Sequence, residues 1–162
     1  SIENVVVLVL FAIFAMTIVA VLALGANQYK SLVERDNNAY NKRIITSYVS
    51  AQIRGYDRAD AVKVGGFASP DVDDEVNTMH LLETIDGIRY DLKIYYYQGK
   101  VYELFAAEES EMKPEDGVAI MDAKDLHFEK KGSLIRITSK DSEGRENETT
   151  VSLRSEESGV AL

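Results

Sequence analysis

Side chains that could carry out catalysis are few and scattered along the chain. Only two histidines occur, His80 and His127, and each stands in an alternating, strand-like run, which favours a core or surface imidazole over a catalytic one. The chain contains no cysteine, so thiolate metal sites, disulfides and thiol catalysis are excluded. The GxSxG, HExxH and phosphate-binding glycine motifs are also missing from the sequence. The sequence therefore predicts no enzymatic activity and no cofactor.

One acidic group has the composition of a calcium site. Asp71, Asp73, Asp74 and Glu75 offer the carboxylate oxygens that Ca²⁺ prefers. They lack the spacing and the central glycine of an EF-hand loop. We interpret the group as a solvated acidic loop, with a metal site as the weaker alternative.

Charge is distributed very unevenly along the 162 residues. No charged residue occurs between Asn4 and Tyr29, residues 30–58 carry a net charge of +3, and residues 59–162 carry −11. A strongly acidic C-terminal part disfavours direct binding to nucleic acid or to anionic lipid surfaces. The basic stretch, which follows the uncharged segment, could meet lipid head groups or the acidic part of another copy.

The uncharged segment has the length of a membrane span. Residues from Val5 to Leu24 form a run of 20 in which only Thr17 is polar, and a helix of that length covers the roughly 30 Å of a bilayer core. Because the run is apolar on all sides, lipid or other apolar helices must surround it. A cleaved signal peptide is the alternative, but the run is longer than a typical signal core and no basic residues precede it.

The charges that flank the span indicate its orientation in the membrane. Lys30 and Arg35 follow the span, so the positive-inside bias by itself would place the acidic head in the cytoplasm. A basic leader removed from in front of Ser1 would reverse this orientation. We expect that such a leader is encoded and cleaved.

Helical spacing continues beyond the span. Residues 29–58 contain no proline, and an apolar stripe recurs at helical intervals; its members are Tyr29, Leu32, Val33, Tyr40, Ile44, Tyr48, Val49 and Ile53. Gly55 is the expected end of the helix. If several such helices pack against one another, Gly25 is the expected place for the helix to bend or unwind, because glycine is a weak helix former. The sequence thus predicts one helix of about 50 residues whose second half is amphipathic.

From residue 59 onward the hydrophobic pattern changes to a period of two. Strand-like runs occupy residues 61–67, 78–85, 88–97, 100–106, 118–123, 126–130, 134–139 and 149–155. Turn signals separate several of them, at Asp86-Gly87, Gln98-Gly99, Lys131-Gly132 and Glu143-Gly144. In residues 88–97 the alternation predicts one buried face and one solvent-exposed face.

These patterns predict an α+β protein. A hydrophobic helix, which either spans a membrane or packs against other apolar helices, occupies residues 1–28, its amphipathic continuation residues 29–58, and an antiparallel β head residues 59–162. One face of a single sheet must be covered, and the amphipathic stripe of the long helix is the natural cover.

The sequence resembles type IV pilins and pseudopilins. The resemblance rests on Ser1-Ile2-Glu3-Asn4, on the apolar run VVVLVLFAIFAMTIVAVLAL and on the head segment IRYDLKIYYYQGKVYELF. The stretch from Leu10 to Arg54 is also similar to a little-characterised pilin-like family of Gram-positive anaerobes. In pilins the characteristic acid is usually the fifth mature residue, whereas Glu3 is the third residue here.

The resemblance implies a function as well as a fold. A prepilin peptidase would remove the leader, and an assembly motor with its platform proteins would move the single-pass membrane precursor into a helical, self-associated filament at the cell surface. Ser1 and Glu3 would serve assembly, since a carboxylate is costly in a hydrocarbon environment unless paired, here with the α-amino group of a neighbouring subunit. Capping of its own helix is the alternative role for Glu3.

Two other functions stay open at this point. The chain could be a minor pseudopilin of a secretion or DNA-uptake machine. It could also be a single-pass membrane protein whose extracytoplasmic β domain binds a partner without polymerising.

Overall fold

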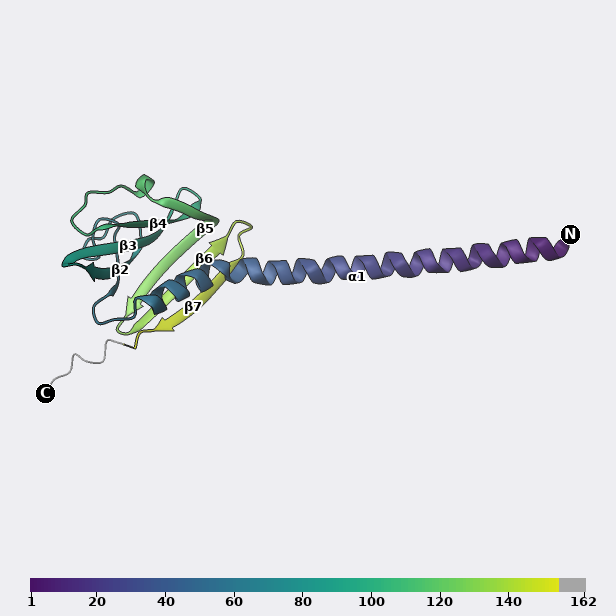
Figure 1. The fold of residues 1–162 in the computed structure, drawn as a ribbon, viewed down its shortest axis with the longest axis horizontal. Coiled ribbons are helices and arrows are strands. Elements are labelled where there is room, and N and C mark those ends of the chain that lie inside the picture. Colours follow the sequence, from purple (N-terminus) through teal and green to yellow (C-terminus); the bar gives the residue numbers. More distant parts are fainter. Residues whose placement is uncertain (155–162) are drawn as a thin grey trace. The chain divides into compact units, whose positions relative to one another are not determined.

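In the computed structural model of this chain, the backbone is described for residues 1–154 and the side chains for residues 1–31 and 43–154. A long helix, α1 (Ile2–Gly55), precedes the strands of an antiparallel sheet (Figure 1). The strands are β1 (Val62–Gly65), β2 (Thr78–Ile85), β3 (Ile88–Tyr97), β4 (Lys100–Ala107), β5 (Val118–Lys131), β6 (Leu134–Asp141) and β7 (Glu146–Ser152). A short 3₁₀ turn, η1 (Pro114–Asp116), precedes β5. The predicted α+β class is confirmed, as is the end of the helix at Gly55.

The chain forms two compact units that meet within α1. One unit is Ser1–Tyr40 and the other is Asn41–Leu162. The sequence divided the chain by polarity, after residues 28 and 58, whereas the compact units follow packing. The C-terminal turns of α1 therefore belong to the same unit as the sheet, which we call the head.

The sheet is a simple meander. Its strand order is the chain order, β1 to β7, and every neighbouring pair is antiparallel. Asp86 and Gly87 have φ of 52° and 80°, and Gln98 and Gly99 have 44° and 82°. Positive φ at both central residues is typical of the type I′ turn, whose twist matches a two-stranded hairpin. Both turn predictions are confirmed.

The strand β5 is longer than the sequence analysis predicted. The sequence predicts separate strands over residues 118–123 and 126–130, but these runs form one strand of 14 residues with an irregularity between Ala123 and Asp125. The first part of β5 pairs with β4, and the rest pairs with β6. Such an irregularity bends a strand and increases its twist. It lets a single strand serve both parts of the sheet.

The bend brings the second half of β5 back toward the start of the sheet. The Asn77 side-chain amide donates to the Phe128 carbonyl (3.1 Å) and accepts from the Phe128 amide (2.7 Å). The Lys130 ammonium donates to the carbonyl of Val62 in β1 (3.0 Å). The two parts of the curled sheet consequently share one hydrophobic core.

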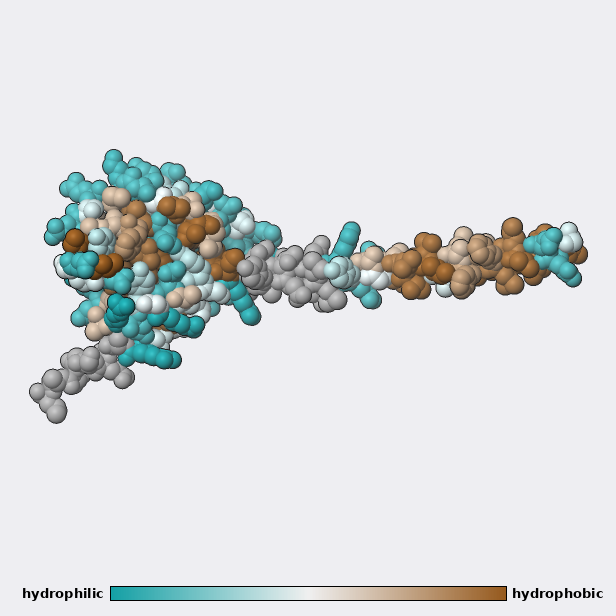
Figure 2. Space-filling view, viewed as in Figure 1, coloured by the Kyte–Doolittle hydropathy of each residue, from teal (hydrophilic) through white to brown (hydrophobic). Residues whose placement is uncertain are grey.

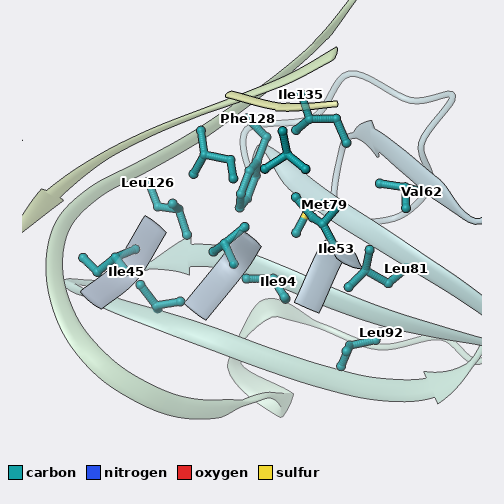
Figure 3. Close-up of a cluster of buried hydrophobic side chains, with 14 of the residues drawn as sticks. Ile45, Ile53, Val62, Met79, Leu81, Leu92, Ile94, Leu126, Phe128 and Ile135 are labelled. Atoms are coloured by element: carbon teal, nitrogen blue, oxygen red, sulfur yellow. The ribbon is translucent and has the colours of Figure 1, made fainter. Parts of the chain in front are cut away.

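The last turns of α1 fill this core. Ile45, Val49 and Ile53 are completely buried, and Figure 3 shows Ile45 and Ile53 between side chains of β2 and β3 on one side and of β5 and β6 on the other. The expected cover of the sheet by the amphipathic helix is confirmed. Ile44 and Tyr48, by contrast, lie at the edge of the core and are only partly buried.

Two polar residues explain why the buried face of α1 differs from the predicted apolar stripe. Thr46 and Ser50 are buried beside the isoleucines, although their side chains are polar. The Ser50 hydroxyl donates to the Thr46 carbonyl (2.6 Å), and Asn147 of β7 donates to the Thr46 hydroxyl (2.6 Å). Because both hydroxyls have partners, burying them carries no large penalty. Because Thr46 and Ser50 are polar, the hydrophobic pattern of the sequence does not place them on the buried face of the helix.

The prediction of a solvent-exposed face on β3 is wrong. Asp91, Lys93 and Tyr95 alternate with the apolar residues of β3 and therefore belong to the face predicted to be exposed, but all three are buried. The segment between β1 and β2 and the segment between β4 and β5 cover them: the Phe67 ring meets Tyr95 edge-on with centroids 4.9 Å apart, and the Tyr95 hydroxyl donates to the Pro114 carbonyl (2.6 Å). Both faces of this part of the sheet are thus covered, one by α1 and one by loops.

Candidate functional site

The most extensive unpartnered surface among the described side chains is the first part of α1. Residues Ile2–Ser31 form a helical segment long and apolar enough to cross a membrane, and none of its most apolar stretch is buried. Figure 2 shows apolar side chains along this segment. Large residues such as Leu8, Phe11 and Met16 are each more than 70% exposed. By its length and composition this segment is consistent with a membrane anchor, and a cleavable signal sequence has the same two properties.

Its few polar groups are compatible with an apolar environment. The hydroxyl of Thr17 donates to the Ile13 carbonyl (2.9 Å), one turn earlier in the same helix. A hydroxyl satisfied in this way does not need water, which the core of a bilayer or of a helix bundle lacks. Glu3 lies in the first turn, where the partial positive charge of the helix N-terminus favours a carboxylate. Ser1 immediately precedes the helix.

Gly25 lies inside an uninterrupted helix. The helix runs from Ile2 to Gly55. Apart from the two neighbouring residues and the backbone of the adjacent helical turns, no atom lies within 4 Å of the position that a Cβ on Gly25 would take. The bend expected here concerned helices packed in a filament, so it stays a prediction. The stripe residues Leu32, Val33 and Tyr40 lie outside the described side chains.

The acidic group of the sequence analysis lies in the loop of residues 66–77, hereafter loop 66–77, which joins β1 to β2. Asp74 accepts hydrogen bonds from the amides of Phe67 (2.8 Å), Ala68 (3.0 Å) and Val76 (3.0 Å). Its carboxylate is thereby used to fix the loop. Asp71, Asp73 and Glu75 are exposed. No group of three or more His, Asp or Glu side chains with an arrangement suited to a metal ion occurs among the described residues.

The electrostatics of Asp74 agree with this structural role. Burial raises the pKa of its carboxyl, but the amides of Ala68, Phe67 and Val76 and the nearby His80 outweigh burial, so that the pKa is lowered. An ionised carboxylate is the better acceptor for these amides. Asp74 is therefore a loop-fixing residue in the described structure.

The two histidines differ completely in their surroundings. His127 is exposed on β5, and His80 is completely buried on β2. The imidazole of His80 lies between the Asp91 carboxylate and the Gly66 carbonyl, 2.6 and 2.7 Å away. The alternating sequence pattern does not predict this cluster. The only signal for it was the pair Gly65-Gly66, which marks a close approach of backbone segments.

A partly buried polar contact also joins α1 to the sheet. The hydroxyl of Tyr48 donates to the carboxylate of Glu103 in β4. Burial, together with the hydrogen bond to Glu103 and the negative charge of Glu103, raises the pKa of the Tyr48 hydroxyl far above its usual range. Tyr48 is consequently protonated at any physiological pH, and it fixes the orientation of α1 on the sheet.

Comparison with known proteins locates a family within the head. Residues 40–142 match a family model whose description is "Domain of unknown function (DUF4860)". The match begins where the head begins and extends through β6. No curated protein and no solved structure matches the chain.

Proposed function

We propose that this chain, which belongs to the DUF4860 family of domains of unknown function, is a structural subunit of an extracellular filament of the type IV pilus kind. The precursor spans the membrane once, and the mature chain self-associates through the first part of α1. A prepilin peptidase, an assembly motor and its platform proteins are the partners that this proposal requires. The acidic head then forms the outer surface of the filament.

The observation that carries this proposal is the combination of Glu3 with the uncharged helix that follows it. A simple membrane anchor needs an apolar surface, but it does not need a carboxylate at its start. If several such helices pack together, water is excluded and Glu3 needs a cation. The first basic side chain downstream is Lys30, about 40 Å away along the helix. The amino terminus of a neighbouring copy is the cation that packing in a filament would supply.

The test is the substitution Glu3→Ala in cells that produce the protein. Removing one partner of a buried ion pair typically costs about 3–5 kcal/mol, and every subunit of the polymer would lose that stabilisation. We expect Glu3→Ala to yield membrane-inserted protein with a folded head and few or no filaments after shearing. The matched control is Glu111→Ala, which removes an exposed carboxylate of the head and should leave filament number unchanged.

The outcomes separate this proposal from the other two functions. Normal filament numbers from the Glu3→Ala cells would mean that Glu3 only caps its helix. If sheared filaments contain the unmodified chain only in trace amounts, the chain is a minor pseudopilin. If the unmodified chain stays entirely with the membrane after shearing, it is an anchored binding domain.

A further inference from the structure

His80 is a buried histidine whose two ring nitrogens both face hydrogen-bond acceptors. Nδ1 lies 2.6 Å from Oδ2 of Asp91, and Nε2 lies 2.7 Å from the carbonyl oxygen of Gly66. The side chain of His80 is 0% exposed, so water cannot replace either partner. Gly66 belongs to loop 66–77, whereas His80 and Asp91 belong to the sheet. The imidazole therefore bridges the sheet and the loop.

The number of protons on this cluster follows from the chemistry of its partners. A backbone carbonyl can only accept, and so can an ionised carboxylate, whereas a neutral imidazole has a single N–H to donate. Both contacts are satisfied only when an extra proton is present. That proton lies either on the ring, giving imidazolium and carboxylate, or on Asp91, giving a neutral pair. The pair has no net charge in either arrangement.

Charged groups of both signs face the imidazole. Lys63 of β1 is its cross-strand partner, and Lys93 lies on the same face of β3, with its ammonium 4.4 Å from the centroid of the Phe67 ring. The carboxylates are Asp91 of β3 and Asp74 of the loop. Oδ1 of Asp91 is buried without a hydrogen-bond partner. The contact between Oδ2 and His80 is therefore the one that offsets the cost of burying this carboxylate. The two acids favour the extra proton, and the two lysines oppose it.

Loop 66–77 fits closely over this part of the sheet. A Cβ on Gly65 would lie 2.1 Å from the Pro70 carbonyl oxygen, and one on Gly66 would lie 2.4 Å from the Val72 carbonyl oxygen. The loop also carries Phe67, which packs on Tyr95 and Leu104 in a small aromatic cluster. The contact between His80 and Gly66 ties the start of the loop directly to β2. Without the extra proton, a nitrogen lone pair of His80 would face an acceptor oxygen at one end of the bridge.

We propose that His80 is a proton-dependent latch that holds loop 66–77 over the β2–β3 face, and that loss of the extra proton releases the loop and uncovers the aromatic cluster. The latch is closed at lower pH, where the pair keeps its extra proton, and it opens as the pH rises. This inference depends only on the head and does not require the filament.

The test uses the full chain in detergent micelles with a fluorescent reporter in the loop. The sequence contains no tryptophan, so Phe67→Trp places a single indole inside the aromatic cluster. We expect its emission to shift to the red and acrylamide quenching to increase as the pH is raised from about 6 to about 9, below the range in which unperturbed tyrosine and lysine lose their protons.

Three further substitutions in the reporter background identify the group responsible. His80→Gln should abolish the pH-dependent transition, and His127→Gln, which changes the only other histidine, should leave it intact. Asp91→Asn should keep the loop closed throughout, because the new amide donates to Nδ1 while a neutral ring donates to Gly66. An unchanged transition in either His80→Gln or Asp91→Asn, or no transition in the reporter chain itself, would overturn the proposal.

A second measurement does not depend on the reporter. Nitrogen-15 spectra of the histidine rings in the unsubstituted chain contain signals from two residues only. At about pH 6, the lower end of this range, where the latch is closed, we expect either two ring N–H groups on His80 or one N–H together with a protonated Asp91. A ring with one N–H beside an ionised Asp91 would contradict the latch.

Discussion

At the scale of single residues, Asp141 stabilises the turn between β6 and β7. Its carboxylate accepts hydrogen bonds from the amides of Glu143 (2.9 Å) and Arg145 (3.0 Å) and from Nε of Arg145 (2.7 Å). Burial raises the pKa of Asp141, but the bonds from Arg145 and Glu143 outweigh burial and lower it. The turn predicted at Glu143-Gly144 is therefore fixed by the ionised side chain of Asp141.

A pH dependence of stability follows from Asp141 and Asp74. Because the pKa of both carboxyls is lowered in the folded state, their stabilisation is complete above the unfolded value, about 3.9. It is lost as the pH falls through the folded values. We expect Asp141→Asn to lower the free energy of unfolding at pH 7 by about 1–3 kcal/mol and to make the loss of stability below about pH 4 less steep.

Urea unfolding of the full chain in detergent, followed by circular dichroism at several pH values, measures this change. The control is Asp122→Asn, since Asp122 is exposed and forms only a surface ion pair with Lys100. A control variant that loses as much stability as Asp141→Asn would contradict the assignment of the effect to the turn.

At the scale of elements, the C-terminal turns of α1 supply the centre of the core. Ile53 is completely buried, whereas Ile88, at the tip of the β2–β3 hairpin, is 51% exposed. Truncating a buried isoleucine removes apolar contacts and leaves a cavity, and truncating an exposed one does neither. The two residues therefore form a matched pair.

We expect Ile53→Ala to lower the free energy of unfolding by about 2–5 kcal/mol and Ile88→Ala to change it by no more than about 0.5 kcal/mol. Denaturant unfolding of both variants is the measurement. Equal effects of the two substitutions would mean that α1 does not pack in the core as described.

At the scale of the whole molecule, the two compact units predict where the chain can be divided. Among the described side chains, the buried core residues of the head begin at Ile45 and include three from the last turns of α1. A fragment that begins at residue 41 keeps this core complete. A fragment that begins at residue 59, where the β-type sequence pattern starts, lacks Ile45, Val49 and Ile53.

We expect residues 41–162 to fold as a soluble monomer with a cooperative thermal transition. Residues 59–162 should be unfolded or aggregated, because losing three buried aliphatic side chains costs about 2–5 kcal/mol for each. The total is comparable to the roughly 5–15 kcal/mol by which a typical domain is stable. Calorimetry and size-exclusion chromatography of both fragments distinguish the cases. A folded 59–162 fragment would show that the sheet does not need the last turns of α1 in order to fold.

Much of the head could be read from local sequence patterns. The hairpins at Asp86-Gly87 and Gln98-Gly99 are confirmed because a type I′ turn depends on the residues that form it. The apolar run is confirmed as helix for a similar reason, since its length and composition are local properties. The resemblance to pilins and the role of Glu3 in assembly are not settled by these patterns and stay predictions.

The sequence by itself thus determined the helix, nearly all of the strand positions and the turns that join several of them. Only the tertiary structure decided that β5 is one bent strand, that Asp91, Lys93 and Tyr95 are buried, and that His80 joins the sheet to loop 66–77. The physical reason is the range of the contacts. Alternation reports the environment of one strand, but it carries no information about a loop, distant along the chain, that covers the second face. His80 and Gly66 are 14 residues apart, and folding alone brings them together.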